Sequence, residues 1–250
     1  MRLADAVALI TGASSGIGAA TAAALAAAGA RLVLTGRDPG RLAAVAARTG
    51  GMAIPADLTD PDDAARLADE AVSKAGRVDV LVSNAGTGWA GTIAELSAEK
   101  ATELVSLNLL APIQLARLLA PGMADRGRGQ LVFVSSIAGA TGVRNEAVYA
   151  AAKAGLNCFA ESLSYELAGQ GVGVSIVLPG VVDTPFFSRR GRRYDRRWPA
   201  PIPAERVAQA ITDAVARDLG VVYVPGWMRF PAWLHGASPA AFRRLAGRFG

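Results

Sequence analysis

Residues that bind metal ions or form disulfides are almost absent from this chain. Its 250 residues include one cysteine, Cys158, and one histidine, His235. A single cysteine excludes an internal disulfide, and these two residues are too few to hold a structural zinc ion. We therefore expect a metal-free protein in which Cys158, set among apolar neighbours, is an inert buried thiol and His235 is structural.

A targeting or membrane-spanning segment is also missing at the N-terminus. Met1 to Asp5 lead directly into the apolar run 7–10, which is too short for a signal-peptide core and far too short to cross a bilayer. We therefore expect a cytoplasmic protein. The 52% hydrophobic content fits one large α/β domain or two small ones, and we favour a single domain over residues 1–250 because no linker or repeat interrupts the pattern.

Negative charge is scarce in the last quarter of the chain. Residues 185–250 hold 12 arginines and 4 acidic residues, whereas residues 1–184 hold 14 basic and 17 acidic residues. A basic balance is typical of nucleic-acid-binding proteins, but the first three quarters are mildly acidic and carry no nucleic-acid motif. We expect no nucleic-acid partner.

Short apolar runs alternate with segments of helical spacing along the chain. The predicted strands are 7–10, 32–35, 52–55, 78–82, 131–135, 174–178 and 221–224. The predicted helices are 17–28, 39–48, 61–75, 98–120, 146–168 and 203–217. This alternation predicts an α/β fold, a doubly wound (Rossmann) parallel sheet of seven strands with helices on both faces. Ligands of such folds bind beyond the carboxyl ends of the strands, so the loops there are the places to look for function.

The first of these loops is rich in glycine and joins the first predicted strand to its helix. Glycines let the backbone approach a pyrophosphate, whose charge meets the positive end of the helix dipole. A glycine pattern alone also fits an ordinary tight turn. The predicted cofactor contacts here are Gly12, Ser14, Ser15, Gly16, Ile17 and Gly18.

A tyrosine and a lysine are spaced for proton transfer in the predicted helix 146–168. Tyr149 and Lys153 stand four residues apart and so share a helix face, and Ser136 precedes the tyrosine by thirteen residues. At an effective dielectric of about 20, a charge about 4 Å away favours the ionised phenol by up to about 4 kcal/mol, or roughly three pK units. The spacing therefore predicts a lowered pKa for Tyr149 and a role as general acid and base.

Two asparagines point to the same region. Asn84 begins an Asn-Ala-Gly sequence, with Ala85 and Gly86, after the fourth predicted strand. Asn108 lies inside a predicted helix, and because asparagine is a poor helix former, a buried one there indicates a polar task. An exposed surface asparagine is the alternative.

In order and spacing, these motifs resemble the classical short-chain dehydrogenase/reductase family from Leu3 to about Val224. The shared elements are Thr11–Gly18, Asn84–Gly86, Asn108, Ser136, Tyr149 with Lys153, and Pro179-Gly180. The resemblance implies a reaction in which hydride passes between a nicotinamide and a carbonyl or secondary alcohol. It also implies a homo-oligomer, either a dimer or a tetramer.

The resemblance assigns a role to each of these residues. Tyr149 donates a proton to the carbonyl oxygen, Ser136 hydrogen-bonds that oxygen, Lys153 holds the ribose hydroxyls, and Asn108 fixes a water that relays protons. Ser135 is an alternative to Ser136, but the thirteen-residue spacing favours Ser136. The nicotinamide is expected to contact Pro179, Gly180, Val182 and Thr184.

Arg37 follows the second predicted strand, where the choice of cofactor is made. An acidic residue there accepts the ribose 2′-hydroxyl of NAD, whereas a cation binds the 2′-phosphate of NADP. Arg37 therefore predicts NADP(H), although Ser15 stands where many NADP-preferring relatives carry a second basic residue. A solvated surface arginine is the alternative reading of Arg37. The resemblance places Asp57 and Leu58 around the adenine.

Two segments are expected to shape the substrate side. Residues 185–202 form a basic substrate lid whose self-repelling arginines keep it mobile when empty and attract an anionic handle, although a plain solvated loop is the ordinary alternative. Its arginines are Arg189, Arg190, Arg192, Arg193, Arg196 and Arg197, and its aromatic residues are Phe186, Phe187 and Trp198.

Residues 225–250 form an aromatic, amphipathic extension where many bacterial relatives end in an Asp-Gly-Gly strand, which places a tetramer in doubt. Its last helix begins at Ser238-Pro239, with Phe242, Leu245 and Phe249 on one side and Arg243, Arg244 and Arg248 on another. Such a helix suits an anionic membrane, but we expect it to cover the pocket or a subunit interface because one apolar stripe normally packs on protein.

We therefore predict an NADP(H)-dependent oxidoreductase that reduces a carbonyl in an apolar, anion-bearing substrate. The same site run in the oxidative direction is an alcohol dehydrogenase. A catalytically silent NADP(H)-binding regulator is the alternative from another class. The intact set of Asn108, Ser136, Tyr149 and Lys153 argues against it, since a regulator has no need of a proton donor.

Overall fold

Seven parallel strands form the centre of the computed structural model, which describes residues 1–192, 194–195 and 198–249, with side chains described as far as Leu245. Their spatial order is β3-β2-β1-β4-β5-β6-β9. The first three strands are added towards one edge of the sheet and the later ones, from β4 on, towards the other, which defines a doubly wound sheet. The strands are β1 Val7–Thr11, β2 Arg31–Thr35, β3 Met52–Ala53, β4 Val80–Ser83, β5 Gly129–Val134, β6 Val172–Pro179 and β9 Val221–Val224. The predicted fold class is confirmed.

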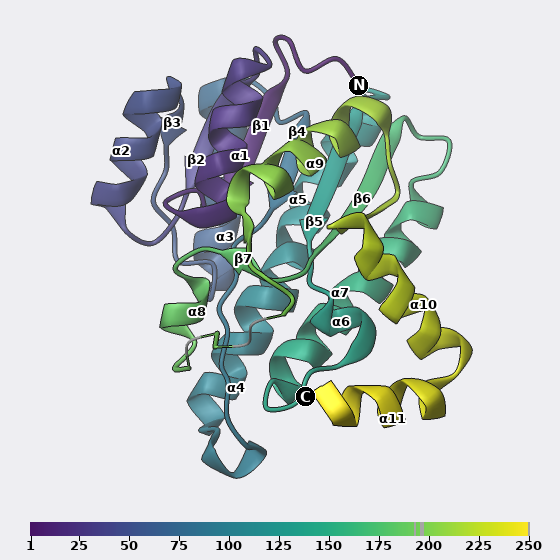
Figure 1. The fold of residues 1–250 in the computed structure, drawn as a ribbon. Coiled ribbons are helices and arrows are strands. Elements are labelled where there is room, and N and C mark those ends of the chain that lie inside the picture. The colour runs from purple at the N-terminus through teal and green to yellow at the C-terminus, as the bar shows by residue number, and fades with distance from the viewer. Residues whose placement is uncertain (193, 196–197, 250) are drawn as a thin grey trace.

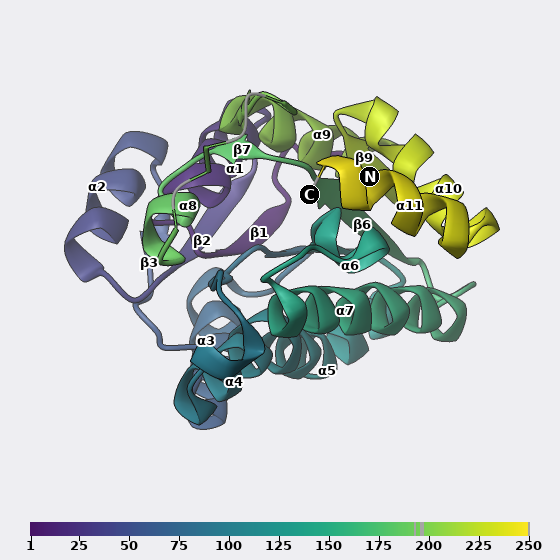
Figure 2. The same cartoon turned by 60° about the horizontal axis from the view of Figure 1, so that its bottom comes forward.

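Helices cover both faces of this sheet (Figures 1 and 2). The main helices are α1 Gly16–Ala27, α2 Pro39–Thr49, α3 Pro61–Ala75, α4 Ala98–Val105, α5 Ala111–Asp125, α7 Ala147–Glu166 and α9 Ala204–Arg217. Apolar residues of α1, α2 and α9 pack on one face, and those of α3, α5 and α7 pack on the other. Because both faces are covered, β1, β4 and β5 are buried along their whole length, as expected for a parallel sheet.

The helices α2 and α3 begin and end where the sequence supplies caps. Asp38 and Asp60 accept backbone N–H groups of the first turns, and a proline follows each of them. Gly50 and Gly76 end the helices in the left-handed conformation that favours glycine. The two N-caps therefore mark where the loops after β2 and β3 end.

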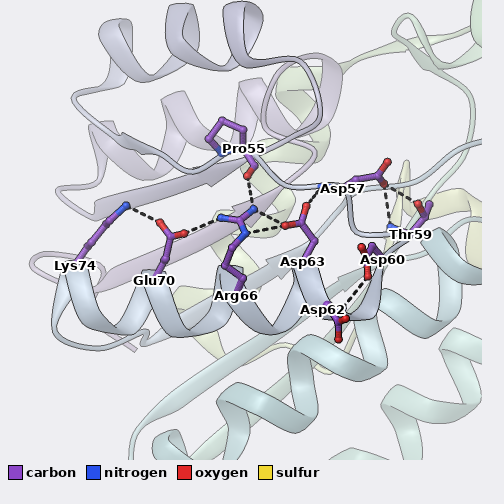
Figure 3. A network of polar contacts seen from close by, with 9 residues as sticks. All are labelled: Pro55, Asp57, Thr59, Asp60, Asp62, Asp63, Arg66, Glu70 and Lys74. Atoms are coloured by element: carbon purple, nitrogen blue, oxygen red, sulfur yellow. Dashed lines mark hydrogen bonds and ion pairs between the residues drawn. The ribbon is translucent and has the colours of Figure 1, made fainter.

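A network of ion pairs fastens the loop after β3 to α3 (Figure 3). Arg66 donates to Asp63, Glu70 and the carbonyl of Pro55, at 2.6 to 2.8 Å. Asp63 in turn accepts the backbone N–H of Asp57, which holds its carboxyl pKa below the usual range. The loop 55–60 is thereby held in position before it reaches the site.

Several elements were not predicted from the sequence. The predicted helix 98–120 is divided into α4, a π-helical turn at Ser106–Leu110, and α5. Other elements were also missed, most of them too short to show a hydrophobic period. They are α6 Ala138–Thr141, β7 Val182–Asp183, α8 Phe186–Arg189, β8 Ile202–Pro203, α10 Arg229–Ala237 and the 3₁₀ turns Ile93–Glu95 and Gly226–Met228. The last predicted helix is present as α11 Pro239–Phe249.

The helical span Ala98–Asp125 is long and apolar enough to cross a membrane by length and composition. Half of its most apolar window is buried inside the domain, where Leu115 and Leu119 pack against the sheet. Its apolar character is thus explained by packing in the core. No other helix of the described residues meets the same length and hydropathy criteria.

The expectation that Cys158 is a buried thiol is wrong. The thiol is exposed, not buried. It lies on the outward face of α7 with Ala151, Ala154 and Tyr165, which follow the helical spacing of an exposed face. Apolar neighbours in the sequence did not make it a core residue, because the adjacent positions point in other directions.

Candidate active site

One large cavity of about 1280 Å³ opens at the carboxyl ends of the central strands. Ligand sites of drug size usually occupy about 300–1,000 Å³, so this cavity has room for a dinucleotide with a substrate beside it. It brings together residues far apart in the sequence. Of the predicted residues, the following line it: Gly12, Ser14, Ser15, Gly16, Ile17, Arg37, Leu58, Asn84, Ala85, Gly86, Asn108, Ser136, Tyr149, Lys153, Pro179, Gly180, Val182 and Thr184.

The glycine loop is packed so closely that side chains do not fit. A Cβ on Gly18 would lie 2.3 Å from the carbonyl oxygen of Gly12, so Gly18 packs α1 against β1 and does not itself line the cavity. Gly12 and Gly16 have φ values of 65° and 55°, which only glycine adopts readily. The loop therefore presents bare backbone at the N-terminus of α1, which is the cradle that a pyrophosphate requires.

Thr11 and Asn84 tie the ends of β1 and β4 together. The Thr11 hydroxyl accepts the backbone N–H groups of Asn84 and Ala85, each at 2.9 Å. The Asn84 side-chain amide donates to the carbonyl of Thr11 at 2.9 Å. The amide nitrogen of Asn84 therefore supports the glycine loop, while the residue still lines the cavity.

Two arginines and two acids meet at the end of β2, where the sequence predicts the ribose 2′ position. Arg37 is half exposed and approaches Glu103 at 3.8 Å, a long and weak contact. Arg41 also lines the cavity and pairs with Asp38 at 2.7 Å. Asp38 also caps α2, and the backbone N–H of Arg41 is the largest cause of its lowered carboxyl pKa. Asp38 is therefore already paired, whereas Arg37 is held only loosely.

Of the predicted adenine contacts Asp57 and Leu58, only Leu58 lines the cavity. Leu58 is buried and lines the cavity. Asp57 does not line it; its carboxylate accepts the backbone N–H and hydroxyl of Thr59, as Figure 3 shows. Asp57 therefore shapes the turn that presents Leu58.

Tyr149 lies at the inner end of the cavity, and only 7% of its surface is exposed. Burial raises its pKa well above the usual value, and a hydrogen bond with Ser136 acts in the opposite direction. Of the nearby charges, Glu146 raises this pKa and Arg190 lowers it. The predicted net lowering of the pKa of Tyr149 is wrong for this structure, because desolvation outweighs the charges around the phenol.

Lys153 is buried on the same face of α7. Its ammonium donates to the carbonyl of Val134 at 2.9 Å, and burial lowers its pKa to about 8. Ser135 donates to the carbonyl of Lys153 at 3.3 Å and so serves the backbone of α7. That leaves Ser136 as the serine at the phenol, in agreement with the thirteen-residue spacing.

Asn108 occupies the π-helical turn, a local distortion that is frequent at functional sites. Its side-chain nitrogen donates to the carbonyls of Thr87 and Leu104, each at 2.9 Å. Its side-chain oxygen is fully buried and has no hydrogen-bond partner among the described residues. A buried acceptor of this kind needs a donor, and it fits the water that the resemblance implies at this place. The exposed-surface reading of Asn108 is excluded.

The basic segment 185–202 is pinned where the structure describes it. Arg190 forms an ion pair with Glu146, and both side chains are about nine-tenths buried. The guanidinium also lies 4.6 Å from the ring centre of Phe187. Arg189 and Arg192 line the cavity as well, and Arg192 is 3.8 Å from Glu95. Arg193, Arg196 and Arg197 lie outside the described residues.

The expected self-repulsion of this segment is therefore offset by acids from elsewhere in the chain. Glu146 was not predicted as a partner of these arginines, because it lies 44 residues from Arg190 in the sequence. Glu146 precedes Tyr149 by three residues in the sequence. A residue that pairs with Glu146 therefore lies near the phenol of Tyr149.

The aromatic extension contributes one residue to the cavity. Met228 is buried, and its Cε would lie 2.6 Å from a Cβ on Gly180, so it backs the predicted nicotinamide loop. No described side chain of α10 or α11 lines the cavity. His235 packs edge-on against Phe242 with 5.1 Å between ring centres and joins α10 to α11, which is the structural role predicted for it. Arg248 and Phe249 lie outside the described side chains.

Comparison with known proteins decides the family. Residues 6–195 match the sequence model of the short chain dehydrogenase family. The chain belongs to the short-chain dehydrogenase/reductase family. The ketoacyl reductase HetN of a Nostoc species is 38% identical over 226 residues, which are 86% of this chain and 77% of HetN.

Two solved structures of the family are similar over almost the whole chain. A short-chain dehydrogenase from Sphingobium yanoikuyae in complex with NADPH has a TM-score of 0.83 and 33% identity over 95% of each chain. A short chain dehydrogenase/reductase from Burkholderia phymatum in complex with NAD has a TM-score of 0.87 and 26% identity, also over 95% of each chain. The protein is thus an oxidoreductase of this family with a nicotinamide cofactor, and the two neighbours differ in which one they hold.

Proposed function

We propose that this short-chain dehydrogenase/reductase is an NADP(H)-dependent reductase of a carbonyl group in an apolar, anion-bearing substrate. The observation that carries the proposal is the meeting of Ser136, Tyr149 and Lys153 with the glycine loop in one cavity. A nicotinamide supplies the hydride when it is bound there. The residues of the chain then have to hold the carbonyl oxygen and give it a proton.

Tyr149 is suited to be the proton donor. Burial keeps its pKa high, so the phenol is protonated at neutral pH and has a proton to give to an oxygen that gains negative charge. Ser136 donates a second hydrogen bond to the same oxygen. After the transfer, the phenolate regains a proton through Lys153 and a water held by the unpartnered oxygen of Asn108. The buried ammonium stabilises the phenolate while it lasts.

The choice of NADP(H) rests on the arginines at the end of β2. Asp38, which lies near the expected ribose, is occupied by Arg41 and by the N-terminus of α2. Arg37 has only the long contact with Glu103 to give up, so it is the cation available for a 2′-phosphate. Arg41 supplies the second cation that Ser15 does not.

The substrate side of the cavity combines an apolar wall with positive charge. Tyr149 packs with Leu104, Ala138 and Ala150 in an apolar cluster that Trp89 and Phe186 extend. Arg189 and Arg192 line the same cavity. This pairing suits an apolar chain that ends in a carboxylate or phosphate, and the acyl thioesters reduced by ketoacyl reductases are one class with these properties. We expect a homo-oligomer in the cytoplasm.

The deciding experiment is consumption of NADPH and NADH against a panel of ketones, quinones, steroids and acyl thioesters. Tyr149→Phe should abolish turnover on any active substrate while NADPH binding is retained, because only the transferable proton is removed. Oxidation of the corresponding alcohols tests the reverse direction. A catalytically silent regulator would bind NADPH tightly and reduce nothing on the panel. Retention of most activity by Tyr149→Phe would refute the proton-transfer assignment.

A further inference from the structure

Four large aromatic side chains are exposed at one edge of the molecule. Trp198, Trp227, Phe230 and Trp233 expose 68%, 44%, 63% and 63% of their surfaces. Trp198 stacks on Trp227 with 5.1 Å between ring centres, and Phe230 stacks on Trp233 at 5.9 Å. We call these four residues the C-terminal aromatic surface. A soluble monomer rarely exposes so much contiguous apolar area without a partner for it.

The helix that carries this surface is not part of the core. None of the nine residues of α10 is buried, although Phe230, Ala232, Trp233, Leu234 and Ala237 make most of it apolar. Trp227, Phe230 and Trp233 are spaced three residues apart, so they follow one face of the turn Gly226–Met228 and of α10. Figures 1 and 2 both place α10 and α11 at the margin of the molecule, beyond the end of the sheet.

The C-terminal segment that carries three of these aromatic side chains is basic and holds no acidic residue. No acidic residue occurs between Asp218 and Gly250. Arg229, Arg243 and Arg244 are exposed, and none of them forms an ion pair with a side-chain carboxylate of the described residues. Arg229 also lines a shallow depression between Tyr223, Phe230 and Trp233. Exposed aromatic rings with arginines nearby suit a surface in which an apolar layer lies beneath an anionic one, as in a bilayer of anionic lipids.

We propose that the C-terminal aromatic surface binds the surface of an anionic phospholipid bilayer. Tryptophan prefers the interface between headgroups and acyl chains, and arginines beside it are attracted to anionic lipids. A second copy of the chain fits this surface poorly. In a two-fold contact the patch meets its own copy, and because residues 219–250 hold no acid, this segment of the second copy offers the arginines no carboxylate.

Docking in this way brings two sequence neighbours of the cavity lining to the membrane. Tyr194, Pro199 and Met228 line the cavity, and the last two are the immediate neighbours of Trp198 and Trp227. Trp198 and Trp227 do not line the cavity themselves, but each stands next to a residue that does. An apolar substrate dissolved in the bilayer would then approach Tyr149 from this side. This consequence rests on the proposed function, whereas the docking itself does not.

The test measures binding of the purified full-length protein to vesicles by sedimentation. One set of vesicles is phosphatidylcholine alone, and in the other about a third of the lipid is phosphatidylserine, the main anionic class of a cytoplasmic leaflet. We expect binding to the anionic vesicles and little to the neutral ones. Replacing Arg229, Arg243 and Arg244 with Gln should lower the partition coefficient by about 100-fold, from about fivefold for each arginine. Phe230→Ser with Trp233→Ser should lower it by at least about tenfold.

A matched control removes the same charge elsewhere. Arg31, Arg48 and Arg117 are exposed on β2, α2 and α5, and their replacement with Gln should leave vesicle binding within about twofold of the wild type. Bromine-labelled lipid gives a second readout. It should quench the tryptophan fluorescence of the wild type but not that of a variant in which Trp198, Trp227 and Trp233 are Phe and only Trp89 is left.

Three results would overturn the proposal. The wild type could fail to bind anionic vesicles, or the control variant could lose as much binding as the test variant. The Phe230→Ser, Trp233→Ser protein could instead fall to a smaller mass in solution while the wild type ignores vesicles, which would make the surface a contact between copies. Activity on a water-soluble substrate should be unchanged in the variant that lacks Arg229, Arg243 and Arg244 and in the Phe230→Ser, Trp233→Ser variant, so failure of the docking proposal is separable from failure of the proposed function.

Discussion

The ion pair between Arg190 and Glu146 links the substrate lid to the proton donor. Glu146 stands directly before α7, three residues from Tyr149. Arg190 follows α8, and its carbonyl accepts the backbone N–H of Ala90 at 3.1 Å. Phe186, at the start of the same short helix, is 5.6 Å from the Tyr149 ring. Breaking the pair should therefore loosen the wall that encloses the phenol.

The size of the effect follows from the burial of both partners. Exposed ion pairs contribute about 0–1 kcal/mol, and removal of one partner of a buried pair costs about 3–5 kcal/mol. Side chains that are 10% and 13% exposed lie near the buried limit. Because α8 is short and has no buried residue, we expect the lid to open when one partner is removed, so that water solvates the remaining charge. The free-energy cost of losing the closed lid should be about 2–3 kcal/mol. Global unfolding should change little.

The assay is a double-mutant cycle on substrate turnover. Glu146→Gln and Arg190→Gln should each raise KM for the best substrate by about 30- to 150-fold, the equivalent of about 2–3 kcal/mol. The double variant should be no worse than either single one, because the interaction is removed only once. Thermal unfolding serves as the control and should shift by no more than a few degrees. Additive losses of the two single variants, or a KM that does not change, would refute this reasoning.

Three further predictions address the cofactor region and the buried lysine. Burial lowers the pKa of Lys153 to about 8, so its charge is lost as pH rises through 8, whereas the raised pKa of Tyr149 keeps the phenol protonated. Binding of NADPH, followed by fluorescence, should therefore weaken above about pH 8, and Lys153→Arg should move that decline to higher pH. Arg37→Gln should lower the NADPH to NADH ratio of kcat/KM by about 10- to 100-fold, and an unmutated enzyme that prefers NADH would exclude the assignment. Gly18→Ala should weaken NADPH binding and cost about 1–3 kcal/mol of stability, while Gly220→Ala, which meets no atom within 4 Å, should be neutral.

The layered fold could be predicted from the sequence because its signals are local. Each buried strand is a short apolar run, and α2 and α3 carry a cap, a proline and a final glycine at their ends. Short elements carry no such signal. β7 and β8 pair only two residues each, Val182 with Ile202 and Asp183 with Pro203, and nothing local distinguishes them from loop.

The residues of the site were predicted more fully than their interactions. Spacing placed Ser136, Tyr149 and Lys153 together, but it could not show that burial outweighs charge at the phenol. Arg41 was missed because its pairing with Asp38 depends on the cap geometry of α2. Glu146 was missed because its partner lies 44 residues away, and a contact of that range depends on the tertiary structure.

The π-helical turn makes the length of a helix part of the catalytic apparatus. Each residue of an α-helix rotates the chain by about 100°, and a π turn accommodates one residue more than an α-helix would. Deleting a single residue between Ser106 and Leu110 would allow one regular helix to run from α4 into α5. The side chains of α4 and α5 would then be rotated by about 100° relative to one another. Either Asn108 would turn away from Lys153, or the apolar face of α5 would turn away from the sheet. A variant library that contains only substitutions would never sample this kind of inactivation.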